Sequence, residues 1–212
     1  LFESEPLFRN EMLAADRLYS SISGHSLIDT LYASTNKISD PFTSTTVTHP
    51  AIFSVQCAMT KLLRANGIVP DYVLGASVGE FAAAVTSGII GFEAALQAVY
   101  KQAQILEKTC LAGSMIAILG SPELYKHPCI CQNSELASVN FRSHFVISGS
   151  RSNMKYIEAF LKSEEIPHQV LAVSQGFHST CIDPAAEEFI GFTSSLSIHP
   201  PQLPYYSASG LH

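Results

Sequence analysis

A serine stands in the stretch of this chain best suited to chemistry, residues 75–79, whose sequence is Gly-Ala-Ser-Val-Gly. An apolar run (72–74) precedes it and a run rich in small residues (81–85) follows, a pattern that predicts a strand, a sharp turn and a helix. Such a turn holds its serine outward, and the flanking glycines let the strand and the helix approach each other closely. Backbone N–H groups at the start of the helix point toward an oxyanion that would form on the acyl group. Glu80 is expected to cap the helix. Ser77 is therefore a candidate nucleophile for acyl transfer; the alternative is a buried Gly-Ser turn of an ordinary α/β domain.

A nucleophilic serine needs a base, and His178 is the best candidate. It follows directly after a segment, residues 113–174, that is expected to form a separate lobe, and the chain would return it to the cleft between lobes. Spacing alone gives the other histidines nearly equal weight, and no acid is clearly placed to orient His178, although Asp183 follows nearby. Gln175 and Gly176 precede the histidine and are expected either to line an acyl pocket or to form a plain turn.

Composition excludes several classes of function. The chain has 212 residues, 47% of them hydrophobic and 14% charged, which predicts a globular protein of one large domain or a domain with a small lobe. The net charge is −6 without basic runs, so we expect no nucleic-acid partner. No apolar stretch approaches the ~20 residues of a membrane span, and no signal peptide is visible.

The five cysteines are expected to be reduced thiols of a cytoplasmic protein. Cys129 and Cys131 stand too close together for a usual zinc ribbon pair, and no second pair follows, so no metal site is expected. The chain begins at Leu1 rather than Met, so we expect it to be a fragment or a trimmed form of a longer protein.

The elements expected around the serine turn are mainly helical. Helices are expected within the first 35 residues, followed by a polar loop over residues 36–48. A long helix should then begin with Thr48 or His49 as its cap and Pro50 in its first turn. The tail, 199–210, is expected to form a strand approached through a turn.

The second half of the chain has a different pattern of predicted helices and strands. A helix is expected over residues 92–108, with Gln102 as the polar member of an apolar stripe. From residue 113 onward the predicted order is β-α-β-β-α-β, ending in a strand at 170–173. This is the split βαβ pattern of a small ferredoxin-like lobe.

Three spaced segments carry a resemblance to a known family. Residues 49–51, 70–83 and 173–178 resemble the acyltransferase family of fatty-acid and polyketide synthases, and the similarity extends over nearly the whole chain. The resemblance implies an α/β fold: an α/β-hydrolase-like large subdomain (1–112 and 175–212) with an inserted ferredoxin-like small subdomain (113–174). Family members are longer at both ends, so we expect this chain to be truncated there.

The resemblance also implies a mechanism. Ser77 would be the nucleophile, His178 the general acid–base, and the backbone N–H of Val78 one oxyanion donor. The acyl group would arrive as a thioester on the phosphopantetheine of an acyl carrier protein or of coenzyme A. No further cofactor would be needed, and association with a polyketide synthase assembly line is a possible consequence.

Two departures from the family bear on the substrate. Family members that select malonyl groups carry a histidine where Ala76 stands and an arginine where Gln102 stands; the arginine would grip the malonyl carboxylate. Lys101 is adjacent to Gln102 but points about 100° away around the helix. Both changes favour neutral acyl groups such as acetyl.

Three functions remain open from the sequence. The pattern with Gln102 resembles the discrete proofreading acyl hydrolases of polyketide pathways, which release stalled acyl groups from carrier proteins to water. A transferase that moves an acyl or malonyl group from coenzyme A to a carrier protein would use the same Ser77 and His178. An inactive acyltransferase-like scaffold is the third hypothesis.

Overall fold

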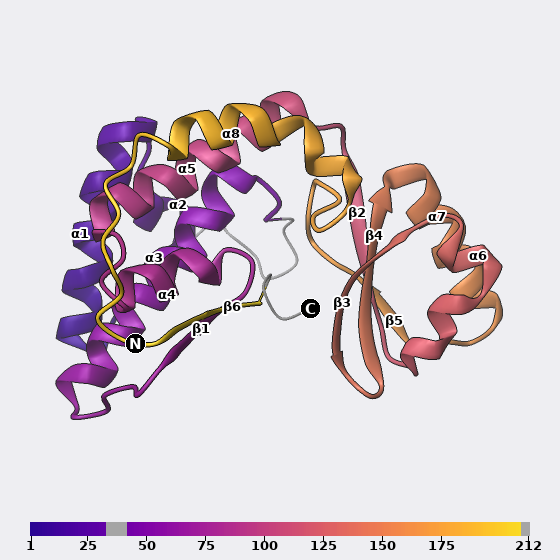
Figure 1. Ribbon diagram of the computed structural model, residues 1–212, viewed down its shortest axis with the longest axis horizontal. Coiled ribbons are helices and arrows are strands. Elements are labelled where there is room, and N and C mark those ends of the chain that lie inside the picture. The colour runs from indigo at the N-terminus through magenta and orange to yellow at the C-terminus, as the bar shows by residue number, and fades with distance from the viewer. Residues whose placement is uncertain (33–41, 209–212) are drawn as a thin grey trace. The chain divides into compact units, whose positions relative to one another are not determined.

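The computed structural model describes residues 1–32 and 42–208, which form two compact units (Figure 1). The first unit comprises Leu1–Asp40, Thr46–Ala103 and Gly191–His212, and the second comprises Pro41–Thr45 and Gln104–Ile190. Within the described ranges, no helix is both long and apolar enough to cross a membrane.

The first unit is mainly helical, with one short parallel pair of strands. Its elements are α1 (Pro6–Ser23), α2 (Leu27–Tyr32), α3 (Thr45–Ala65), β1 (Val73–Gly75), α4 (Gly79–Thr86), the first part of α5 (Phe92–Thr109) and β6 (Tyr205–Ser207). β1 and β6 lie side by side in parallel, with Gly75 opposite Ser207 (Figure 1). The predicted strands at 72–74 and in the tail are confirmed; the parts of the predictions that fall on residues 33–41 and 209–210 lie outside the described residues.

The prediction for the start of α3 was wrong. The helix begins at Thr45, so the expected loop ends earlier and Pro50 lies inside the helix rather than in its first turn. Proline has no N–H to donate to the carbonyl four residues earlier, which is that of Thr46. The hydroxyl of Tyr19 donates to this carbonyl instead, at 3.0 Å. A bond from a distant helix, which periodicity does not reveal, therefore lets the helix continue through Pro50.

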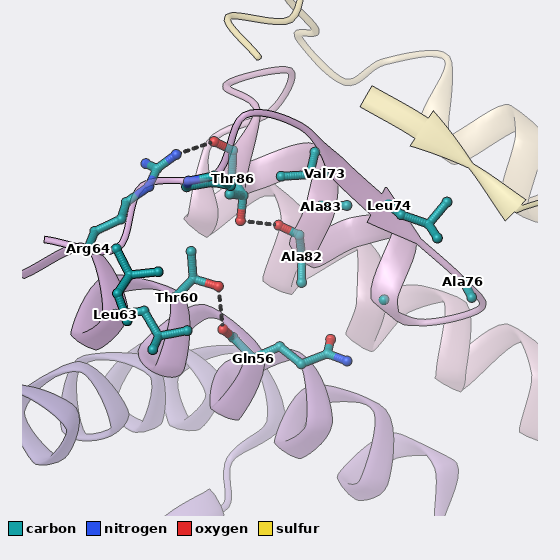
Figure 2. A pocket seen from close by; sticks show the side chains of 13 residues that line it. Gln56, Thr60, Leu63, Arg64, Val73, Leu74, Ala76, Ala82, Ala83 and Thr86 are labelled. Atoms are coloured by element: carbon teal, nitrogen blue, oxygen red, sulfur yellow. Dashed lines mark hydrogen bonds between the residues drawn. The ribbon is translucent and has the colours of Figure 1, made fainter. Parts of the chain in front are cut away.

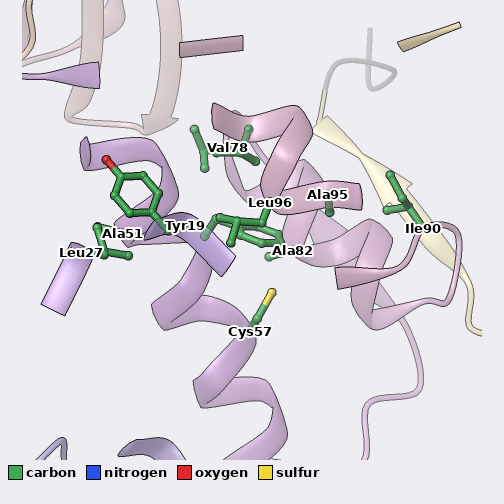
Figure 3. Close-up of a cluster of buried hydrophobic side chains, with 11 residues drawn as sticks. Tyr19, Leu27, Ala51, Cys57, Val78, Ala82, Ile90, Ala95 and Leu96 are labelled. Atoms are coloured by element: carbon green, nitrogen blue, oxygen red, sulfur yellow. The ribbon is translucent and has the colours of Figure 1, made fainter. Parts of the chain in front are cut away.

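A hydrophobic core joins these helices to the serine turn (Figure 3). Its buried members come from α1, α2, α3, α4, α5 and the turn before α4, and include Tyr19, Leu27, Phe53, Val78, Ala82, Leu96 and Val99. Val78 and Ala82 are apolar anchors on either side of the first turn of α4. The turn that carries Ser77 is therefore fixed to the core by the residue that follows the serine.

The second unit contains an antiparallel sheet of four strands. Its elements include β2 (Gly113–Ile118), η1 (Pro122–Lys126), α6 (Pro128–Cys131), β3 (Glu135–Phe141), β4 (His144–Ser150), α7 (Arg151–Ser163), β5 (His168–Val170), η2 (Thr180–Ala185) and the greater part of α8 (Ala186–Thr193). The strand order is β3-β4-β2-β5, with all three pairings antiparallel (Figure 1). The element order agrees with the predicted split βαβ pattern.

The last strand of this sheet differs from its prediction. β5 ends at Val170, whereas residues 170–173 were expected to form the strand. The N–H of Leu171 still donates to Met115, but the N–H of Val173 donates back to the Leu171 carbonyl at 2.9 Å. The chain therefore turns out of the ladder after Val170, although its residues are apolar and suit a strand.

Candidate active site

Ser77 lies at the apex of a tight turn between β1 and α4. Its backbone φ is 54°, in the left-handed region that residues with a side chain rarely adopt, and its side chain is exposed. The strand before it and the helix after it are both short, and Val78 behind it is buried. The turn therefore presents the serine hydroxyl to solvent on a strained but anchored backbone, as the sequence predicts for a nucleophile.

The two glycines of the turn have different roles. A Cβ atom added to Gly75 would lie 2.5 Å from the Cα of Glu80 and 2.9 Å from its nitrogen, so the first turn of α4 packs directly on this glycine. A Cβ added to Gly79 would meet only the Nε2 atom of Gln56, at an ordinary 3.7 Å. Close approach of strand and helix thus depends on Gly75 and not on Gly79.

The N–H of Val78 is suited to bind an oxyanion. The next three N–H groups of the helix start already donate to the carbonyls of Ala76, Ser77 and Val78, at 2.9, 3.0 and 3.2 Å. In the part of the chain that the structure describes, no hydrogen bond from the Val78 N–H is recorded. An unspent donor at the start of a helix, next to the serine, can stabilise negative charge on an acyl oxygen.

Glu80 does not cap α4, contrary to expectation. The helix has Val78 at its cap position, without a side-chain cap bond. The Glu80 carboxylate instead accepts hydrogen bonds from the Tyr205 hydroxyl, the Ser207 hydroxyl (2.8 Å) and the Ala208 N–H (3.0 Å). Burial, and after it the bond to Glu80 and the charge of Glu80, raise the pKa of Tyr205 above its usual range. Glu80 therefore ties the serine turn to β6, a contact that only the parallel strand pair makes possible.

A pocket of about 470 Å³ in the first unit reaches the residue before the serine. Figure 2 shows Ala76 at one end of this pocket and Arg64 at the other. Most of the lining is apolar, and Arg64 donates to the Thr86 carbonyl at 3.0 Å. The pocket can hold an uncharged, apolar group close to the serine turn.

The sequence analysis did not identify Gln56, which lines this pocket from α3. Its Oε1 atom is buried and has no hydrogen-bond partner among the described residues. The signal that singled out Gln102, a polar residue on an apolar helix, was also available for Gln56. Gln102 itself is half-buried on α5, on the same helix as the buried Val99 and Leu106.

His178 occupies a second strained turn, in the second unit. Its φ is 58° and its side chain is exposed, while the neighbouring Ser179 is buried. The Ser179 hydroxyl donates to the Gly176 carbonyl at 2.6 Å and accepts from the Cys181 N–H. The residues around His178 are thus held in place, and the imidazole projects from them into solvent.

Gln175 and Gly176 are both buried beside this turn. The Oε1 atom of Gln175 accepts from the hydroxyls of Ser174 and Thr45, the latter at 3.2 Å. A Cβ atom on Gly176 would lie 2.9 Å from the Gly149 carbonyl oxygen, so a larger residue does not fit. The hydroxyl donors fix the orientation of the Gln175 amide, so that its oxygen faces them and its nitrogen does not.

The predicted site residues therefore form two groups. Ala76, Ser77 and Val78 share one turn, and Gln102 belongs to the same unit. Gln175, Gly176 and His178 share the other turn, in the second unit. Ser77 and His178 belong to different units, so the role of His178 as the base for Ser77 stays a prediction.

The described residues hold no cluster of three or more His, Cys, Asp or Glu side chains that could bind a metal ion. All five cysteines are free thiols. Burial raises the pKa of the Cys57 thiol to about 12, so this thiol is a core side chain rather than a nucleophile.

Known proteins resemble this chain along its whole length. A family model described as the acyl transferase domain matches residues 1–211. The polyketide biosynthesis acyltransferase homolog BaeD of Bacillus velezensis is 46% identical over 210 residues, which are 99% of this chain and 65% of that protein. The polyketide biosynthesis acyltransferase homolog PksD of Bacillus subtilis is 42% identical over 98% of this chain and 64% of its own length. The chain thus spans a little under two thirds of these relatives.

Solved structures share the fold. The loading acyltransferase from the avermectin modular polyketide synthase superposes with a TM-score of 0.84 at 23% identity, over 98% of this chain and 66% of that one. MCAT from Streptococcus pneumoniae superposes with a TM-score of 0.76 at 25% identity, over 97% of this chain and 68% of that one. With its mixed α/β fold and its match over residues 1–211, this chain belongs to the acyl transferase domain family.

Proposed function

We propose that this chain is the serine-bearing part of a polyketide-biosynthesis enzyme that takes acyl groups from acyl-carrier-protein thioesters and releases them to water. Ser77 is the nucleophile and His178 the general acid–base. The enzyme favours neutral acyl groups such as acetyl over malonyl, and its role is proofreading.

The observation that carries this proposal is the backbone conformation of the two residues. Only three non-glycine residues of the described chain have a positive φ, and two of them are Ser77 at 54° and His178 at 58°. Strain of this kind costs about 1–3 kcal/mol for each residue and concentrates at functional sites. A purely structural Gly-Ser turn gives no reason for the exposed His178, in a turn far along the sequence, to carry the same strain.

The proposed reaction has two halves. His178 accepts the hydroxyl proton of Ser77 while the serine oxygen attacks the thioester carbonyl, and the C–S bond then breaks as His178 protonates the leaving thiol. In the second half, water attacks the acyl-serine and gives its proton to His178. The C–O bond to Ser77 breaks, the serine recovers its proton, and the free acid leaves. The N–H of Val78 stabilises the oxyanion in both halves.

The preference for neutral acyl groups rests on Ala76 and Gln102. Neither side chain supplies the cation that a malonyl carboxylate requires, and an unpaired buried charge costs several kcal/mol. Each 1.4 kcal/mol corresponds to a tenfold loss in rate. Arg64 also lines the pocket that reaches Ala76, but it lies at the end of the pocket opposite Ala76 (Figure 2).

Acyl transfer from coenzyme A to a carrier protein is the second candidate. The names of BaeD and PksD favour it, because both are called acyltransferase homologs. The two functions share the acyl-serine and differ only in the acceptor. An inactive scaffold is the third candidate, and the strained Ser77 and His178 argue against it.

The proposal includes the fold and the setting of the whole protein. We propose an α/β-hydrolase-like large subdomain (1–112 and 175–212) with the ferredoxin-like small subdomain inserted at 113–174. The strand order of the second unit supports the latter assignment. The partner is an acyl carrier protein of a polyketide synthase assembly line, and the protein works in the cytoplasm.

The test uses the full-length enzyme with acetyl-loaded and malonyl-loaded carrier protein, with and without an empty second carrier. Intact-protein mass spectrometry follows the acyl group. We expect acetyl to be lost as free acid at a rate that the second carrier does not change, and malonyl to be lost at least tenfold more slowly. Ser77→Ala should abolish the loss of acetyl from the carrier protein, and Gln102→Arg should reduce the difference in rate between acetyl and malonyl.

Movement of the acyl group to the second carrier would replace the hydrolase with the transferase. If neither substrate forms an acyl adduct on Ser77, the inactive scaffold is the function that remains.

A further inference from the structure

The turn that carries His178 lies against one face of the antiparallel sheet in the second unit. Phe177, the residue before the histidine, packs against the buried Met115, Ala117 and Val146 of β2 and β4. Alternate residues of a strand share a face, so these three side chains mark the face of the sheet that the turn covers. The backbone of His178 is strained, with a φ of 58°. Such strain persists only where the surrounding structure fixes it.

One rung of the same sheet holds the two residues that follow His178. Glu135 of β3 and Ser148 of β4 are direct partners in the antiparallel ladder, so their side chains share a face. The fully buried hydroxyl of Ser148 donates to the hydroxyl oxygen of Ser179 at 3.5 Å. The Oε1 atom of Glu135 accepts from both the N–H and the hydroxyl of Thr180, at 2.9 and 2.7 Å. The two short bonds to Glu135 are the stronger of these contacts.

The hydrogen bonds at the start of η2 give Glu135 a specific task. The N–H of Cys181 donates to the Ser179 hydroxyl oxygen at 3.3 Å, and the N–H of Ile182 donates to the Ser179 carbonyl at 3.2 Å. The N–H of Thr180 finds its acceptor in Glu135 instead, 45 residues earlier in the sequence. Within the described ranges, Glu135 forms no salt bridge. A hydrogen bond to an ionised acceptor is about twice as strong as one between neutral groups.

The acid nearest to the histidine along the chain does not hold it. Asp183 and His178 are both exposed, and the structure records no hydrogen bond between their side chains. Glu135 is half-buried and bonds to the backbone two residues after His178. Because Glu135 stands far from the histidine in the sequence, no pattern around His178 pointed to it.

We propose that Glu135 is a positioning residue for His178. By fixing Thr180, it holds the strained turn, and with it the imidazole, in the conformation that proton exchange with Ser77 requires. The catalytic part of this inference rests on the proposed function. Glu135 acts through the backbone and takes up no proton itself. Since a displacement of about 1 Å can cost about 100-fold in rate, loss of Glu135 should slow the chemical step rather than weaken substrate binding.

The test uses four variants of the full-length protein: Glu135→Ala, Glu135→Gln, Thr180→Val and the double variant Glu135→Ala/Thr180→Val. Glu158→Ala is the matched control, because Glu158 is also a partly buried carboxylate of the second unit, with a partner on its own helix. Three quantities are measured: steady-state hydrolysis of acetyl-loaded carrier protein, the rate at which a serine-directed phosphonate labels Ser77, and amide hydrogen exchange over residues 178–182.

We expect Glu135→Ala to lower kcat and the labelling rate about tenfold, with KM changed by less than about twofold. Exchange of the Thr180 N–H should become about tenfold faster, which corresponds to about 1.4 kcal/mol. Glu135→Gln keeps an acceptor oxygen without the charge and should restore kcat to within about threefold of the wild type. Thr180→Val should cost about threefold alone and nothing further in the double variant, because the two side chains act as one unit.

Faster exchange with unchanged kcat and labelling would make Glu135 a purely structural residue and overturn the proposal. Equal losses in Glu158→Ala, or a raised KM with an unchanged kcat, would overturn it as well. If the wild type transfers acyl groups instead of hydrolysing them, the labelling rate still tests the positioning of His178. A wild type that is neither active nor labelled would refute the proposed function together with the positioning role. A labelled wild type with an equally labelled Glu135→Ala would refute the positioning role alone.

Discussion

The two glycines of the serine turn provide a sharp test, because the sequence pattern treats them alike and the structure does not. Gly75→Ala places a methyl group 2.5 Å from the Cα of Glu80. Carbon atoms in contact prefer about 3.5–4.0 Å, so strand and helix must separate by about 1 Å. Gly79→Ala places its methyl group at 3.7 Å from a side-chain atom of Gln56, which is an ordinary contact.

We expect Gly75→Ala to lower the free energy of unfolding by about 3 kcal/mol, the upper end of overpacking, because the clash is with backbone. For a protein of this size, that corresponds to a loss of about 6–12 °C in melting temperature. Gly79→Ala should change stability by at most about 0.5 kcal/mol, or raise it slightly, since alanine is the better helix former.

The assay is urea unfolding of the full-length variants, together with the rate at which a serine-directed phosphonate labels Ser77. Gly75→Ala should slow labelling at temperatures where the protein is still folded, because the turn is displaced, whereas Gly79→Ala should label like the wild type. Equal losses of stability in the two variants, or a stable and normally labelled Gly75→Ala, would refute the packing argument.

Three further predictions follow from the hydrogen bonds and pKa values. Glu80→Gln should cost about 2 kcal/mol and Tyr205→Phe about 1 kcal/mol in urea unfolding, because the carboxylate holds three donors and the phenol is one of them; equal costs would contradict this. Tyr19→Phe should lower the free energy of unfolding by about 1 kcal/mol, and by clearly less in a Pro50→Ala background, where the N–H of the new alanine can donate to the Thr46 carbonyl. An equal loss in both backgrounds would contradict the argument that the Tyr19 hydroxyl replaces the missing proline N–H. The pKa of Cys57 rises from 9.0 to about 12 on folding, so its contribution to stability is complete below pH 9 and is lost as the pH rises toward 12; the native thiol should resist iodoacetamide at pH 9, and rapid alkylation there would contradict the burial.

Much of the fold was predictable because it depends on local patterns. Hydrophobic periodicity placed helices in the regions of α1, α3, α5 and α7. The order of elements from β2 to β5 followed from short apolar runs separated by turns. The strained turn of Ser77 was predictable as well, since the glycines and the small residues after it permit little else.

Two of the errors share one physical cause, which is a contact between residues distant in sequence. Pro50 stays within a helix because Tyr19 supplies the missing donor. Glu80 bonds to β6 rather than to its own helix, because the parallel pairing of β1 and β6 brings Tyr205 and Ser207 beside it.

The sequence by itself indicated the candidate chemistry: a serine on a sharp turn, a histidine as its candidate base, and no cation at Ala76 or Gln102. Only the tertiary structure decided that Gly75 is sterically required while Gly79 is not, and that His178 shares the strain of Ser77. Residue types and local spacing carry the first kind of information. Which of the two glycines the close approach requires, and the strain at His178, depend on how separate elements pack, and the local pattern did not reveal them.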